Sequence, residues 1–132
     1  MIGIDTNILA RHYTQDDPVQ SPKATAFLQS HCTEDQPGWI SVPVVCELFW
    51  VLRKAYRYPK SDVIKALKTM RNTQGIEIED VDAFDAALEL YLQSSADFPD
   101  CLIVSRHMLG GVEHTFTFDE AASKLDGFQL LA

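Results

Sequence analysis

A glutamate stands inside the most apolar stretch of this chain. The stretch reads Val44-Val45-Cys46-Glu47-Leu48-Phe49-Trp50-Val51-Leu52, and it follows Pro43, a residue type that often begins helices. In a helix, Glu47 has apolar neighbours at i±1, i+3 and i+4, so no polar face is expected to receive its side chain. An unpaired buried carboxylate costs several kcal/mol or takes up a proton. The sequence therefore predicts that Glu47 is buried and needs a cation beside it.

Two kinds of cation would compensate for Glu47: a basic side chain in an ion pair, or a metal ion. Arg53 and Lys54 lie nearly two helical turns beyond Glu47, which makes a local ion pair poor. A divalent metal shared with other acidic residues explains more. Hard cations such as Mg²⁺ and Mn²⁺ prefer carboxylate oxygens, and no histidine or cysteine spacing typical of zinc sites is present.

Strands and helices are expected to alternate along the chain. The short apolar run Met1 to Ile4 predicts a first strand. Further strands are expected at residues 39–42, 76–79, 115–118 and 128–131, and helices begin near residues 6, 18, 43, 61, 81, 97 and 119. Ser61 is the expected cap of its helix. The predicted fold class is α/β, with a central, mostly parallel sheet flanked by helices, in one domain over residues 1–132.

Two aspartates stand where predicted strands end. Asp5 follows the first strand and Asp119 follows the strand 115–118. Ligands of parallel sheets gather beyond the carboxyl ends of the strands, so Asp5 and Asp119 are expected to share one crevice. Helix capping is the alternative for Asp5, Asp97 and Asp119, and Asp100 could complete a capping box with Asp97.

The charges of the chain are strongly segregated. The net charge is −8, which argues against nonspecific wrapping around nucleic acid. Yet residues 53–71 contain most of the basic side chains and one acid, Asp62, whereas residues 77–100 contain acids and no base. This asymmetry is compatible with a phosphate-binding face beside an acidic pocket, and also with charged helix faces that only interact with solvent.

The same residues resemble a known family. Met1-Ile2-Gly3-Ile4-Asp5-Thr6-Asn7, Glu47 in its apolar helix, Asp97-Phe98-Pro99-Asp100-Cys101-Leu102-Ile103 and Thr115-Phe116-Thr117-Phe118-Asp119 follow one another in the order found in PIN domains. Within that family the chain resembles the VapC-type toxins of type II toxin–antitoxin pairs. The resemblance implies a PIN-like fold and an Mg²⁺-dependent endoribonuclease, with Mn²⁺ as a plausible substitute.

The resemblance also assigns residues and partners. It implies that Asp5, Glu47, Asp100 and Asp119 are the catalytic and metal-binding acids, supported by Thr6, Asn7, Asp97 and Thr117. Glu120 is a candidate auxiliary acid. RNA is the implied substrate, cleaved by a metal-activated water. A cognate antitoxin and a homodimer are the implied assemblies.

Candidates for RNA binding come from the basic stretch. Arg53, Lys54 and Arg57 would hold the backbone, and Tyr56, Tyr58 or Trp50 would stack on a base. For Trp50, a place in the core is the preferred interpretation. The chain has no apolar run of the roughly 20 residues needed to span a bilayer and no secretory signal, so a cytoplasmic protein is expected.

Two other functions are compatible with parts of this sequence. An enzyme that transfers phosphoryl groups through an aspartate would also place Asp5 after its first strand, but Asn7 replaces the second aspartate that this chemistry requires. A PIN-like module that binds nucleic acid without cleaving it would be expected to have lost one of the four acids, and all four are present.

Overall fold

The computed structural model describes residues 1–132, and the chain divides into two compact units, residues 1–79 and 80–132. The elements of the first unit are β1 (Ile2–Gly3), α1 (Thr6–Thr14), α2 (Gln20–His31), β2 (Gly38–Ile40), α3 (Val42–Trp50), the π-helix η1 (Val51–Ala55), α4 (Lys60–Arg71) and β3 (Ile76–Ile78). The elements of the second unit are α5 (Val81–Gln93), α6 (Phe98–Leu109), β4 (Thr115–Thr117), α7 (Glu120–Ser123) and β5 (Phe128–Leu130).

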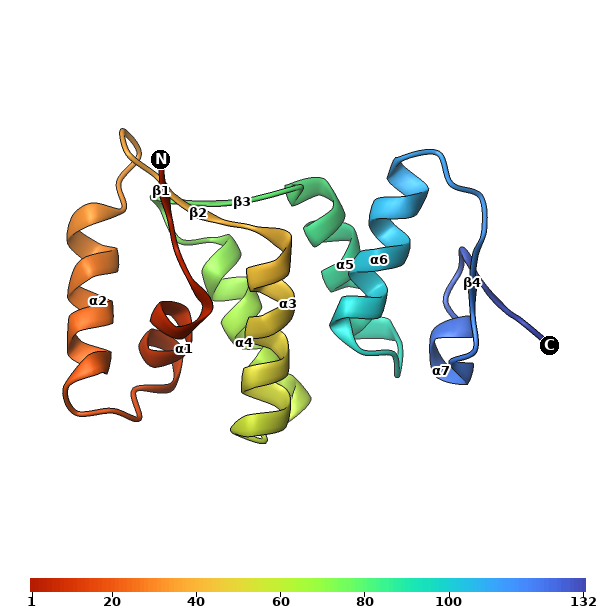
Figure 1. The fold of residues 1–132 in the computed structure, drawn as a ribbon, viewed down its shortest axis with the longest axis horizontal. Coiled ribbons are helices and arrows are strands. Elements are labelled where there is room, and N and C mark those ends of the chain that lie inside the picture. The colour runs from red at the N-terminus through yellow and green to blue at the C-terminus, as the bar shows by residue number, and fades with distance from the viewer. The chain divides into compact units, whose positions relative to one another are not determined.

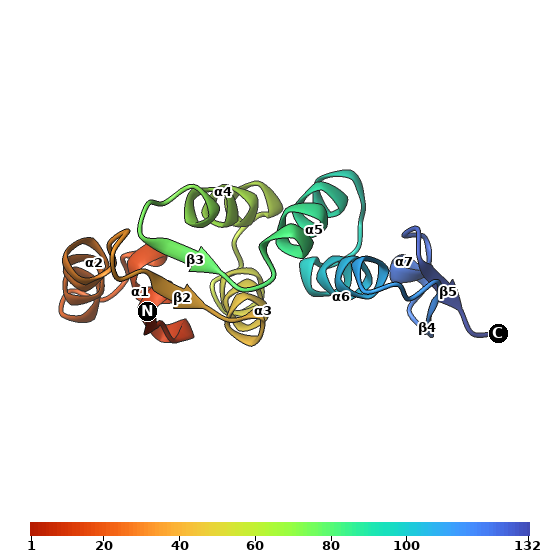
Figure 2. The ribbon, with the colours of Figure 1, turned by 90° about the horizontal axis from the view of Figure 1, so that it is seen from above.

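The first unit is built on a three-stranded parallel sheet in the order β1-β2-β3. Ile2 pairs with Gly38, and Gly38 in turn pairs with Ile76. Neighbouring parallel strands require long crossover connections, and here α1 with α2, and α3 with α4, provide them (Figure 1). Figure 2 shows β2 and β3 as adjacent arrows that run in the same direction.

The core of the first unit lies between its helices and its strands. Val45, Leu48, Phe49 and Leu52 are buried and recur at the spacing of one helical face. Val63, Leu67 and Met70 form the buried face of α4. Helices α1 and α2 lie side by side (Figure 1). The α/β architecture follows from these apolar stripes, which have to be covered by neighbouring elements.

The second unit has a helical pair and a small sheet. Helices α5 and α6 pack side by side through aromatic contacts, with the ring centroids of Phe84 and Phe98 5.5 Å apart and those of Tyr91 and Phe98 5.9 Å apart. An ion pair of 2.9 Å joins Arg106 Nε to Asp80 Oδ2. Strands β4 and β5 are parallel and are connected by the short helix α7.

The structure confirms the predicted fold class and most of the predicted elements. All strand pairs are parallel, as predicted, but the strands divide between a three-stranded and a two-stranded sheet. The prediction that Ser61 caps its helix is wrong, because α4 already begins at Lys60 and its N-cap residue is Pro59. The helix predicted to begin near residue 43 changes at Val51 into the π-helix, in which the N–H of Tyr56 donates to the carbonyl of Val51.

Candidate functional site

The carboxyl ends of the three strands in the first unit carry polar side chains. Asp5 follows β1, Ser41 follows β2 and Glu79 follows β3. Asp5 is exposed, and its Oδ1 accepts a hydrogen bond of 2.7 Å from the N–H of Thr6. The capping role considered for Asp5 is therefore real. This cap engages one carboxylate oxygen of Asp5 and leaves the other free for a ligand.

The two residues after Asp5 differ in exposure, since Thr6 is buried and Asn7 is exposed. Thr6 is 6% exposed, and its hydroxyl oxygen has no hydrogen-bond partner in the protein. Asn7 is exposed. A buried hydroxyl without a partner is uncommon in folded proteins, because its desolvation is not offset by a hydrogen bond. Thr6 directly follows Asp5, so its unpartnered hydroxyl fits a site that holds a further polar ligand or a water molecule.

Glu47 lies on the exposed side of α3, so the prediction that it is buried is wrong. The buried face of the helix consists of Val45, Leu48 and Phe49, and Glu47 is not on that face. The expectation that Trp50 belongs to the core is also wrong, since 39% of this residue is exposed. An exposed carboxylate needs no partner to be tolerated, so burial no longer argues that Glu47 requires a cation.

Glu79 is a structurally important acid that the sequence analysis did not single out. Its Oε1 accepts a hydrogen bond of 2.8 Å from the N–H of Val42, the first residue of α3. Ser41, at the N-cap position, makes no side-chain cap. Glu79 therefore stabilises the beginning of the helix that carries Glu47. The available signal was its place at the end of the strand 76–79, the same kind of place as that of Asp5.

The second unit brings three aspartates near one another. Burial raises the pKa of the Asp100 carboxyl, and the negative charges of Asp119 and Asp97 raise it further. Asp97 is the N-cap residue of α6 but makes no side-chain cap, so the capping box considered for Asp97 and Asp100 is not formed. Asp97 and Asp100 therefore repel each other without the hydrogen bonds that a capping box would supply. A divalent cation is the kind of ligand that relieves such repulsion.

Asp119 is held at the end of β4 by its neighbours. Its N–H donates to the hydroxyl of Thr117 over 3.0 Å, and its Oδ1 accepts from the N–H of Ala122 over 2.8 Å. Thr117 thus orients the aspartate, as a supporting residue would. Glu120, the candidate auxiliary acid, is exposed in the first turn of α7.

The basic side chains in and after η1 differ in how many contacts they make within the protein. One guanidinium nitrogen of Arg53 donates to the carbonyl of Tyr58 over 3.1 Å. Lys54 is exposed, and its ammonium lies 5.6 Å from the centroid of the Trp50 ring, as in a cation–π contact. Arg57 is exposed and has a left-handed backbone, with φ of 56°.

Residues of the candidate site are distributed over both units. Asp5, Thr6, Asn7 and Glu47 belong to the first unit, and Asp97, Asp100, Thr117 and Asp119 belong to the second. No group of three or more histidine, cysteine, aspartate or glutamate side chains has the geometry of a metal centre. The donor types still fit a hard divalent cation, since they are carboxylates and one unpartnered hydroxyl.

Fold and site together define an α/β protein with acidic residues at strand ends and in the first turn of a helix. The PIN domain family model matches residues 2–127, and the chain belongs to this family. Among solved structures, it is similar to the crystal structure of VapC20 from Mycobacterium tuberculosis, a Sarcin-Ricin loop cleaving toxin. The two share 18% identity with a TM-score of 0.47, and the match covers 93% of each chain. No curated protein matches the sequence significantly. None of the helices combines the length and the apolar character that a membrane span requires.

Proposed function

We propose that this protein is a metal-dependent endoribonuclease and the toxin of a type II toxin–antitoxin pair. Membership of the PIN family supports a nuclease. The observation that carries the proposal is the group of Asp97, Asp100 and Asp119, because burial and mutual repulsion raise the pKa of Asp100 and a cation would offset both effects.

Asp5, Glu47, Asp100 and Asp119 are the residues that would hold Mg²⁺ or Mn²⁺. Such an ion, when bound, lowers the pKa of a water molecule and offsets the negative charge that develops on the phosphate. Thr6 fixes one oxygen of Asp5 through its backbone N–H, and Thr117 fixes the backbone of Asp119. Preorganised carboxylates of this kind bind a cation with little loss of side-chain entropy.

RNA contacts outside the acids would come from the exposed side chains near η1. Lys54 and Arg57 supply positive charge, and the exposed ring of Trp50 supplies a surface on which a base can stack. Among the aromatic residues near η1, the exposed Trp50 best supports a stacking role.

Asp5→Asn provides the direct test of catalysis. The substitution removes a negative charge while it preserves size, and Asp35→Asn, at another exposed position in the same unit, is the matched control. We expect Asp5→Asn to reduce Mg²⁺-dependent RNA cleavage about 100-fold or more. Mutation of residues that only hydrogen-bond to metal ligands already reduces metal affinity or activity by about 10- to 100-fold. Asp35→Asn should cleave like the unmodified protein. Cleavage by Asp5→Asn at the control rate would disprove the mechanism.

The same proteins separate the alternative functions. A binding module without catalysis would bind RNA but would not cleave it in Mg²⁺ or Mn²⁺, and Asp5→Asn would leave its binding unchanged. Aspartate-based phosphoryl transfer has no support from the family match, which is to PIN domains.

The toxin role and its partners need a cellular test. Expression of the unmodified chain should arrest bacterial growth, and expression of Asp5→Asn should not. Co-expression of an antitoxin from a neighbouring reading frame should restore growth. The proposed homodimer is tested by the mass of the purified protein in solution. This activity would belong in the cytoplasm, where its RNA substrates are.

A further inference from the structure

Helix α4 carries a polar and basic stripe that the proposed active site does not use. The stripe consists of Ser61, Lys65, Lys68 and Asn72, which recur at spacings of four, three and four residues. At about 100° per residue, these positions fall within about 60° of one another around the helix. The buried residues Val63, Leu67 and Met70 lie on the opposite side. The α4 stripe therefore faces away from the core of its own unit.

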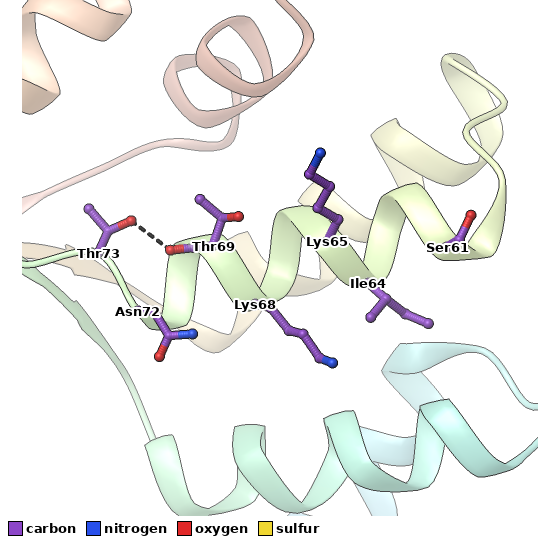
Figure 3. Close-up of a pocket in the computed structure, with 7 residues that line it drawn as sticks. All are labelled: Ser61, Ile64, Lys65, Lys68, Thr69, Asn72 and Thr73. Carbon is purple, nitrogen blue, oxygen red and sulfur yellow. Dashed lines mark hydrogen bonds between the residues drawn. The ribbon is translucent and has the colours of Figure 1, made fainter.

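The α4 stripe lines a surface hollow of about 600 Å³, to which Thr69 and Thr73 also contribute. Figure 3 shows the side chains of Lys65 and Lys68 extending from α4 in different directions, with Asn72 and Thr69 further along the helix. The hydroxyl of Thr73 donates to the carbonyl of Thr69 over 2.6 Å, so its proton is already engaged. The ammonium groups of the two lysines are the charged donors of the hollow.

Neither Lys65 nor Lys68 is neutralised by another residue. Both are exposed, and neither ammonium group takes part in an ion pair or a hydrogen bond. Like charges on neighbouring positions of a helix destabilise it slightly. The protein as a whole carries a net charge of −8, but the surface around these two lysines is locally positive. An anionic ligand would therefore be attracted to this surface although the protein as a whole is negatively charged.

We infer that the α4 stripe is a second contact surface for the RNA backbone, separate from the acids and from Arg53, Lys54 and Arg57. The inference rests on the proposed function, because it assumes that RNA is the substrate. The stripe runs from Ser61 to Asn72, a rise of about 16 Å along the helix axis. Successive phosphates of one strand are about 3.4 Å apart along a duplex axis, so the stripe is long enough to contact several of them. It contacts phosphates rather than bases, because ammonium groups bind phosphate as point charges.

The salt dependence of RNA binding tests the α4 stripe. A labelled 12-nucleotide single strand is titrated in EDTA, which prevents metal-dependent cleavage, at several KCl concentrations. Each phosphate contact contributes about 0.7 to the slope of log K against log salt for single strands, so Lys65→Gln with Lys68→Gln should lower the slope by about 1.4. At 0.1 M salt this corresponds to about 25-fold weaker binding. Lys65→Arg with Lys68→Arg should restore the slope, because the charges remain.

The matched control is Lys23→Gln with Lys124→Gln, which removes two exposed lysines elsewhere and changes the net charge equally. It should leave the slope close to that of the unmodified protein. If Lys65→Gln with Lys68→Gln lowers the slope no more than the control does, the inference is wrong. That result is also expected if the α4 stripe binds an acidic protein instead of RNA. Cleavage of RNA together with an unchanged slope refutes the stripe alone. An unmodified protein that neither binds nor cleaves RNA refutes the proposed function as well.

Discussion

Gly75 is the position at which a single methyl group should be most damaging to the first unit. It lies directly before β3 with φ of 81°, and its carbonyl accepts a hydrogen bond of 2.7 Å from the N–H of Gly38 in β2. A Cβ atom at Gly75 would lie 2.3 Å from the carbonyl oxygen of Cys32 and 2.7 Å from its carbonyl carbon. Both of these are backbone atoms, which cannot rotate away as a side chain can. Gly75→Ala therefore has to displace the chain at Cys32 or at β3.

The loss of stability has two parts. A left-handed backbone costs a non-glycine residue about 1–2 kcal/mol. Overpacking of a well-packed region costs about 1–3 kcal/mol more. Gly75→Ala should therefore lower the free energy of unfolding by about 2–5 kcal/mol, a large share of the roughly 5–15 kcal/mol typical of a folded protein.

Two other glycines separate these parts. Gly111 has φ of 87°, and a Cβ atom there would have no atom within 4 Å, so Gly111→Ala should cost only the backbone part of about 1–2 kcal/mol. Gly3 has neither a left-handed backbone nor a nearby atom, and Gly3→Ala should change stability by less than about 0.5 kcal/mol. Urea unfolding followed by far-ultraviolet circular dichroism provides the three free energies. Equal losses for Gly75→Ala and Gly111→Ala would refute the steric argument.

Two further predictions concern carboxyl groups. Asp100→Asn should raise the thermal midpoint of the metal-free protein at pH 7, because a pKa raised by burial, Asp119 and Asp97 means that ionised Asp100 disfavours the folded state. The gain should vanish at low pH, where Asp100 is protonated, and a lower midpoint at pH 7 in calorimetry would contradict it. Hydrogen bonds, chiefly from the Tyr56 hydroxyl, lower the pKa of Asp16 from 3.8 to about 2, so Tyr56→Phe should raise it in an NMR titration. Because this folded pKa is depressed, its stabilisation is present above about pH 4 and is lost as the pH falls towards 2, and an unchanged Asp16 midpoint in Tyr56→Phe would exclude that cause.

Local signals in the sequence predicted the helices and strands well. Asp5 follows a short apolar run and does cap α1, and Gly110, a residue type that often ends helices, is the C-cap residue of α6. Such signals act within one turn of the chain, so they do not depend on distant packing. The family match over residues 2–127 confirms the PIN resemblance.

Features that depend on packing were not predictable in this way. The helix around Glu47 is apolar on nearly every side, so its sequence does not indicate which face becomes buried, and the structure turns Glu47 and Trp50 outward. The hydrogen bond from Val42 to Glu79 joins residues far apart in the sequence. The division of the parallel strands into two sheets also depends on pairing between distant segments, which the pattern of each strand does not specify.

The π-helix at the end of α3 matters for aligning this chain with others. Its closing hydrogen bond, from Tyr56 to Val51, spans one residue more than an α-helical bond, so the segment is equivalent to a one-residue insertion in a regular helix. Removing that one residue would restore a regular α-helix, and the residues after it would keep their orientation relative to Glu47. A relative with a plain α-helix at this place should therefore align with a single gap between Glu47 and Arg57. Without that gap, each basic residue that follows would be compared with the wrong neighbour.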